Sequence, residues 1–135
     1  MEALNIRAQV AYKTLTHLHE SLEKLNKQEF VTIYEVLRCA ILKRFTLCFD
    51  SFFKFIVLFF QERLQIVVEG ISPRQILQAA LDALLISPEE FKSFLSMIED
   101  RHLASHAYHE ELAQEITQRI PDYYNLMHAV YERLS

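Results

Sequence analysis

Residues Phe45 to Phe60 read FTLCFDSFFKFIVLFF, and this apolar run decides which folds are open to the chain. Phe45, Phe49, Phe52, Ile56 and Phe60 recur at spacings of three and four residues, as side chains on one face of an α-helix do. A membrane-spanning helix needs about 20 mostly apolar residues, whereas this run is shorter and is interrupted by Asp50 and Lys54. We therefore expect a helix that is buried on two faces inside a protein, with no membrane as partner.

The helix built around this run is expected to extend from about Thr32 to Val68, which makes it the longest of the chain. Gly70, the only glycine in the sequence, follows it at a position that suits a helix C-cap. One apolar stripe along such a helix is enough for the core of a single subunit. A second stripe indicates burial against another subunit, so we expect a homodimer.

Two helix start signals lie downstream of this run. Ser72-Pro73-Arg74-Gln75 places serine at the N-cap, proline at the first helical position and glutamine at the third. Ser87-Pro88-Glu89-Glu90 repeats the pattern with glutamate. We therefore expect one helix over Pro73–Leu85 and another that begins at Pro88.

The remaining two helices are expected at the ends of the chain. An apolar stripe predicts a helix over Ala3–Asn26, and another pattern begins near His109 or Glu110, with Pro121 kinking or restarting that helix. The fold class is therefore all-α, an antiparallel four- to five-helix up-and-down bundle, and a single domain over residues 1–135.

The composition agrees with this architecture. A protein of 135 residues with one glycine and three prolines lacks the turn residues that a sheet of many strands requires. Its formal net charge of −4 argues against a broad basic face of the kind that coats a duplex. A local cationic pocket is compatible with that charge, because net charge does not describe one cleft.

The two cysteines and the N-terminal sequence indicate the cellular compartment of the protein. Cys39 and Cys48 are nine residues apart, which on one helix places them on opposite faces and roughly 13 Å apart along the axis. We expect free, buried thiols in a reducing compartment. The first residues, MEALNIRAQV, lack the basic-then-apolar pattern of a signal peptide. Both features predict a cytoplasmic protein.

The polar chemistry is concentrated in residues 99–108, EDRHLASHAY, which contain an Arg-x4-His-x-Tyr pattern. An arginine and a histidine at this spacing are a weak signal alone, since Arg101 in a last helical turn can simply pair with Glu99 or Asp100. His102, His106 and His109 share a helical face and could instead bind a metal. They lack a clear fourth ligand, so we expect no metal and no other cofactor.

With its context, this block resembles the HEPN superfamily, specifically the nucleotidyltransferase substrate-binding proteins and the HepT toxins. The typical family block reads Glu-Asp-Arg-Asn-x-x-Ser-His-x-Tyr, and His102 stands here in place of the common asparagine. Upstream, Arg44-Phe45 and Phe53-Lys54 are similar to the family's Arg-Phe-Glu and Trp-Lys positions, from which Thr46 and Phe53 depart. The residues that match the block are Glu99, Asp100, Arg101, Ser105, His106 and Tyr108.

The resemblance implies a homodimer of helical bundles whose two motifs face one cleft, and, in active members, metal-independent cleavage of RNA. RNA carries its own nucleophile, the 2′-hydroxyl, so a histidine and an arginine are sufficient. The resemblance assigns acid/base catalysis to His106 and the phosphate clamp to Arg101. Supporting roles fall to Asp100, which would orient Arg101, to His102, beside the phosphate or His106, and to Ser105.

Tyr108 has a separate role in the HepT systems. There a partner minimal nucleotidyltransferase adds AMP to this tyrosine, and the added phosphate and bulk silence the ribonuclease. The resemblance therefore implies a toxin–antitoxin pair.

Two alternatives stay open at this level. The chain could be a non-catalytic subunit that presents a substrate or nucleotide to a nucleotidyltransferase, or a helical interaction protein without any site. The same arginine and histidine suit binding and catalysis, so the sequence does not separate the first alternative from a ribonuclease.

Overall fold

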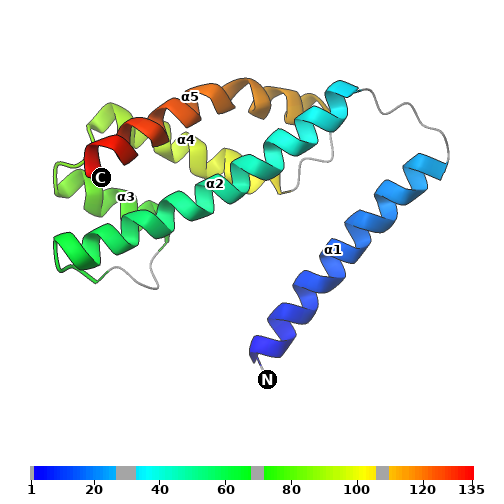
Figure 1. Cartoon of the computed structure of the whole chain (residues 1–135), viewed down its shortest axis with the longest axis horizontal. Helices are drawn as coiled ribbons and strands as arrows, with labels where there is room; N and C mark the ends of the chain where they lie inside the picture. The colour runs from blue at the N-terminus through cyan, green and yellow to red at the C-terminus, as the bar shows by residue number, and fades with distance from the viewer. Residues whose placement is uncertain (1, 27–32, 68–71, 106–109) are drawn as a thin grey trace. The chain divides into compact units, whose positions relative to one another are not determined.

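The structure is a computed structural model that describes residues 2–26, 33–67, 72–105 and 110–135. Within these ranges every regular element is a helix, which confirms the all-α class. Figure 1 shows the helices in chain order: α1 (Glu2–Asn26), α2 (Ile33–Arg63), α3 (Pro73–Asp82), α4 (Pro88–Ala104) and α5 (Glu110–Leu134).

The chain divides into two compact units, residues 1–32 and 33–135. The first unit holds α1, whose apolar side chains, including Leu15 and Leu18, are exposed. The second unit holds the four other helices described and contains the hydrophobic core. A single domain over the whole chain stays a prediction.

The core of the second unit is built on the aromatic run of α2. In this unit α4 runs opposite to α2 and α5, and α2 contacts α3, α4 and α5 (Figure 1). The rings of Phe52 and Phe94 stack with centroids 5.8 Å apart, which joins α2 to α4. Phe60, Phe94 and Met97 have no exposed surface, so the run does supply the core.

Only one face of that run is buried, however. Leu47 and Leu58 keep about half of their surface exposed, at 55% and 53%. The prediction of burial on two faces is therefore wrong for the subunit by itself, because α3, α4 and α5 all pack on the same side of α2. None of the helices described is long and apolar enough to cross a membrane.

Both start signals are confirmed as complete capping boxes. Ser72 N–H donates to Gln75 Oε1 at 2.9 Å while Gln75 N–H donates to Ser72 Oγ at 3.3 Å. Ser87 and Glu90 exchange the same pair of bonds at 2.8 and 3.1 Å. Orphan donors at each helix start are satisfied in this way, which fixes the first residues of α3 and α4.

Two helix ends differ from expectation. α2 ends at Arg63 rather than near Val68, and Gln65 has a φ of 56°. α3 ends at Asp82 rather than Leu85, and Leu84 has a φ of 61°. A left-handed residue stops a helix, but glycine is its usual signal, and neither position has one. Gly70 lies outside the described residues.

Two smaller expectations also change. α5 continues through Pro121 and does not restart there, while a kink at this proline stays a prediction. Cys39 and Cys48 are free, as predicted, but both are exposed, because they lie away from the side of α2 on which the other helices pack.

Candidate functional site

The last turn of α4 carries two adjacent charged residues that face different partners. Asp100 points toward α5 and Arg101 toward α2, since consecutive side chains on a helix are separated by about 100°. This arrangement places Arg101 where the sequence predicted it, at the end of the fourth helix. The two residues therefore belong to separate ion pairs.

All three nitrogens of the Arg101 guanidinium donate hydrogen bonds. Nε and Nη2 donate to Asp50 Oδ1 and Oδ2 at 3.3 and 3.1 Å, and Nη1 donates to Ser105 Oγ at 2.7 Å. The Arg101 side chain is 27% exposed and that of Asp50 48%. The guanidinium is thus held in one orientation by partners that are accessible to solvent and to a competing anion.

Asp50 is the member of the site that sequence reasoning missed. It had been treated only as an interruption of the apolar run, while Arg101 was expected to pair, if at all, with Glu99 or Asp100. The available signal was a single carboxylate within an otherwise apolar helical run. Ser105, a predicted supporting residue, does lie beside Arg101.

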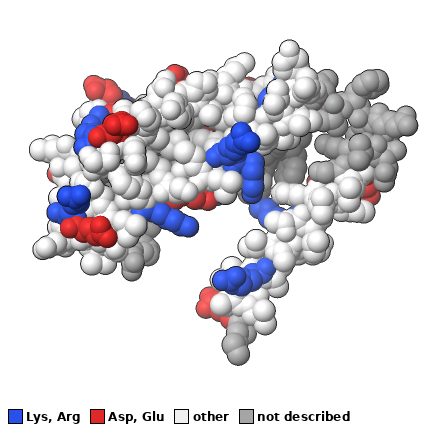
Figure 2. All heavy atoms as spheres, in the orientation of Figure 1, with Lys and Arg blue, Asp and Glu red and all other residues white. Residues whose placement is uncertain are grey.

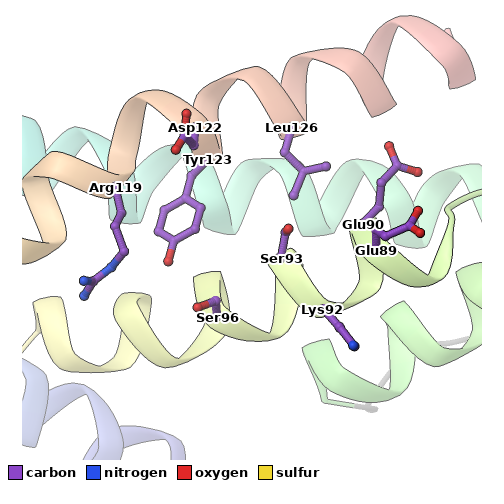
Figure 3. Close-up of a pocket in the computed structure, with 9 residues that line it drawn as sticks. All are labelled: Glu89, Glu90, Lys92, Ser93, Ser96, Arg119, Asp122, Tyr123 and Leu126. Carbon is purple, nitrogen blue, oxygen red and sulfur yellow. The ribbon is translucent and has the colours of Figure 1, made fainter.

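Asp100 is buried and its carboxylate is saturated. It accepts from Arg119 Nε at 2.6 Å and Nη2 at 3.0 Å and from the Tyr123 hydroxyl at 2.5 Å. The expectation that Asp100 orients Arg101 is therefore wrong, because its oxygens are taken by α5. Figure 3 shows Arg119 and Tyr123 reaching from α5 toward α4.

The electrostatics of this cluster follow from its burial. The pKa of Tyr123 is raised, chiefly because burial disfavours the phenolate and also because the hydroxyl donates to Asp100. The hydrogen bonds to the Asp100 carboxylate raise the pKa of Arg119. The cluster is a neutralised ion pair that joins α4 to α5.

Several predicted site residues lie outside the residues described, namely His106, Tyr108 and His109. His102 is on the last turn of α4 and exposed. The described ranges hold no group of three metal-ligating side chains, and the three-histidine alternative falls partly outside them. The approach of His106 to Arg101 accordingly stays a prediction.

A groove of about 460 Å³ lies between α4 and α5 (Figure 3). Its lining includes Ser93, Ser96, Arg119 and Tyr123, but not Arg101. Figure 2 shows basic and acidic side chains scattered over the visible face of the second unit, without one broad basic surface.

Comparisons with known proteins give a family and a solved relative. Residues 7–135 match the family described as nucleotidyltransferase substrate binding protein like. A protein from Thermus thermophilus of known crystal structure is 34% identical, with a TM-score of 0.69 over 85% of this chain and 93% of that one. No curated protein matches the chain.

Proposed function

Because this chain belongs to the nucleotidyltransferase substrate-binding-protein-like family, we propose that it pairs with a separate minimal nucleotidyltransferase and cleaves RNA without a metal. The pair would act as a toxin and its antitoxin in the cytoplasm, where free exposed thiols such as Cys39 and Cys48 are stable. The observation that carries the proposal is the oriented, solvent-accessible guanidinium of Arg101 in the last turn of α4.

The chemistry needs only a cation and a proton carrier. Arg101 binds the non-bridging oxygens of a phosphodiester and stabilises the charge that develops on them. His106 removes the proton of the 2′-hydroxyl or supplies one to the departing 5′-oxygen. The 2′-oxygen forms a bond to phosphorus as the 5′-oxygen leaves, which yields a cyclic phosphate and a 5′-hydroxyl.

Substitution at the two residues tests the proposal. Arg101→Ala and His106→Ala should each lower RNA cleavage by at least about a hundredfold, in the range of a lost general acid or charge stabiliser. Lys92→Ala, an exposed cation of α4, is the matched control and should keep full activity. Cleavage that survives both substitutions would exclude this mechanism.

The family description favours a second candidate, a non-catalytic subunit that binds the substrate of the nucleotidyltransferase. In that case Arg101 would bind a phosphate group of the ligand without breaking a bond. A measurable affinity for the partner or a nucleotide, lost in Arg101→Ala, together with no cleavage by clean wild-type protein, would establish this function instead.

The homodimer is part of the same proposal. The exposed apolar side chains of α2, among them Ile33, Leu37 and Ile41, support it, because a surface of that kind marks protein interfaces. Sedimentation equilibrium should give twice the chain mass for the wild type. Leu37→Glu should shift the equilibrium to monomers, and Leu84→Glu, which changes another exposed leucine, should not.

Tyr108 completes the proposal as the residue that the partner modifies. Incubation with the nucleotidyltransferase and ATP should add one AMP to the wild type and none to Tyr108→Phe, as read by mass spectrometry. The modified protein should lose RNA cleavage because the added phosphate repels the RNA backbone. An equally modified Tyr108→Phe variant would move the site elsewhere.

A further inference from the structure

Asp50, the residue that holds Arg101, lies between two lysines on one face of α2. Lys43 is seven residues before it and Lys54 four after it, so all three side chains fall within a narrow arc of the helix. Along the axis Lys43 lies about 10 Å to one side of Asp50 and Lys54 about 6 Å to the other. The Arg101 guanidinium, bound to Asp50, therefore lies between the helix positions of the two lysines.

Both lysines are exposed. Neither ammonium group forms an ion pair with any residue that the structure describes, whereas three arginines of the second unit are neutralised: Arg38 by Glu110, Arg119 by Asp100 and Arg133 by Glu90. Lys43 and Lys54 thus offer uncompensated positive charge on either side of Arg101. The arrangement is linear because Lys43, Lys54 and Asp50, to which Arg101 of α4 is bound, follow a single helix.

We propose that this face of α2 is a track for single-stranded RNA, in which Lys43, Arg101 and Lys54 bind phosphates that follow one another along the strand. The identity of the polymer rests on the proposed function. A row of cations along one helix suits a linear polyanion, since each ammonium can neutralise one phosphate. It is less suited to a compact ligand such as a single nucleotide, which reaches one of the three positions only.

The track should bind the phosphates of the RNA and should not discriminate between bases. The phenylalanines of α2 that could stack on bases, such as Phe49 and Phe53, are buried in the core. Contacts to phosphates alone carry no sequence information. We therefore expect affinity that is similar for strands of different sequence and that falls steeply with salt.

The test is equilibrium binding of a 2′-O-methyl RNA oligonucleotide, which cannot be cleaved, measured by fluorescence anisotropy over a range of salt. Each of Lys43→Gln and Lys54→Gln should make the slope of log K against log salt shallower by about 0.7, the value for one phosphate contact on a single strand. The double variant should lose about twice as much. Circular dichroism should show unchanged folding, because both side chains are exposed.

Lys92→Gln is the matched control. Lys92 is exposed on α4 nine residues before Arg101, about two and a half turns away and so on the opposite face of that helix. Its slope should equal that of the wild type. An unchanged slope in the double variant, an equal loss in Lys92→Gln, or a wild type that does not bind the oligonucleotide would each overturn the track.

These outcomes are separate from those of the cleavage assay. Binding that depends on Lys43 and Lys54 without cleavage of ordinary RNA would uphold the track and reject the ribonuclease. Cleavage that depends on Arg101, together with a slope of log K against log salt that is unchanged in the Lys43→Gln and Lys54→Gln variants, would support the ribonuclease and reject the track.

Discussion

Asp100 and Arg101 are neighbours in the chain, yet the carboxylates of their two ion pairs differ strongly in burial. The Asp100 side chain is 7% exposed, and its carboxylate receives three hydrogen bonds from Arg119 and Tyr123 of α5. The Arg101 guanidinium meets an Asp50 carboxylate that is 48% exposed. A buried charge must be fully compensated, whereas an exposed pair exchanges readily with water and with other ions.

The difference shows that adjacent residues of one short motif have different roles. The pair built on the buried Asp100 joins the end of α4 to α5, and its Arg119 side chain, although 44% exposed, is bound by that carboxylate through two hydrogen bonds. The exposed pair contributes little to folding, since pairs of this kind are worth about 0–1 kcal/mol, but it presents an oriented cation. Adjacent residues of one motif therefore serve stability and ligand binding separately.

The largest effect that separates the two pairs is expected from removing each carboxylate. Asp100→Ala leaves the Tyr123 hydroxyl and Arg119 without their acceptor and should lower the free energy of unfolding by about 2 kcal/mol. Asp50→Ala should lower it by less than about 1 kcal/mol. Urea unfolding followed by circular dichroism measures both, and equal losses would abolish the distinction.

A smaller change sharpens the same point within the buried cluster. Tyr123→Phe removes only the hydroxyl that donates to Asp100 and should cost about 1.5 kcal/mol of unfolding free energy, as for a bond to a charged group. Tyr124→Phe is the control, because Tyr124 is mostly exposed and should tolerate the change. If both variants had wild-type stability, Arg119 alone would hold Asp100.

The exposed pair should respond in binding rather than in folding. Asp50→Asn removes a negative charge that competes with a phosphate for Arg101, and the affinity for the 2′-O-methyl oligonucleotide should rise about fivefold, equivalent to about 1 kcal/mol. Asp122→Asn, which changes an exposed aspartate of α5, should leave the affinity unchanged. Weaker binding by Asp50→Asn would mean that the carboxylate is needed to orient the guanidinium.

The smallest effect concerns Glu90, which pairs with Arg133 at 2.9 Å. The hydrogen bond from Arg133 holds the pKa of Glu90 below its ordinary value of 4.5. A lowered folded-state pKa stabilises the fold above the unfolded-state value, and this stabilisation is lost as the pH falls through the folded-state value. Glu90→Gln, which keeps the capping oxygen, should cost about 0.5 kcal/mol at neutral pH.

That cost should shrink as the pH falls below 4.5, when the wild-type carboxylate also takes up a proton. Glu89→Gln is the control, since Glu89 is exposed and lies next to Glu90 in the same first turn. A difference between Glu90→Gln and the wild type that does not change with pH would show that the charge of Glu90 adds nothing.

The local features were predictable from the sequence because they depend on neighbours along the chain. Capping at Ser72 and Ser87, the core role of the aromatic run and the position of Arg101 in a last helical turn all follow from short-range patterns. Ion pairs between helices that are distant in the sequence do not follow from such patterns. Nothing in residues 99–108 indicates that Arg101 would meet Asp50, 51 positions earlier, or that Asp100 would meet Arg119.

The predicted ends of α2 and α3 were wrong because the sequence carries no signal at either position. Gln65 and Leu84 adopt left-handed backbone angles that their residue types do not favour. Local backbone bonds close both turns, from Ile66 N–H to Phe60 O and from Leu85 N–H to Ala80 O, without the glycine that marks such an end in a sequence. The prediction that the thiols of Cys39 and Cys48 are buried was wrong because the sequence does not indicate which side of α2 the other helices cover.

Those two thiols give α2 a pair of natural attachment points. Cys39 is one turn before Lys43 and shares its side of the helix, while Cys48 is two and a half turns after Cys39 and lies on the other side. A maleimide dye on Cys39, with Cys48 changed to serine, would therefore report on what arrives beside Lys43. A dye on Cys48, with Cys39 changed to serine, would lie on the opposite flank. The fluorescence of the two labelled variants would therefore report separately on the two sides of α2 in solution.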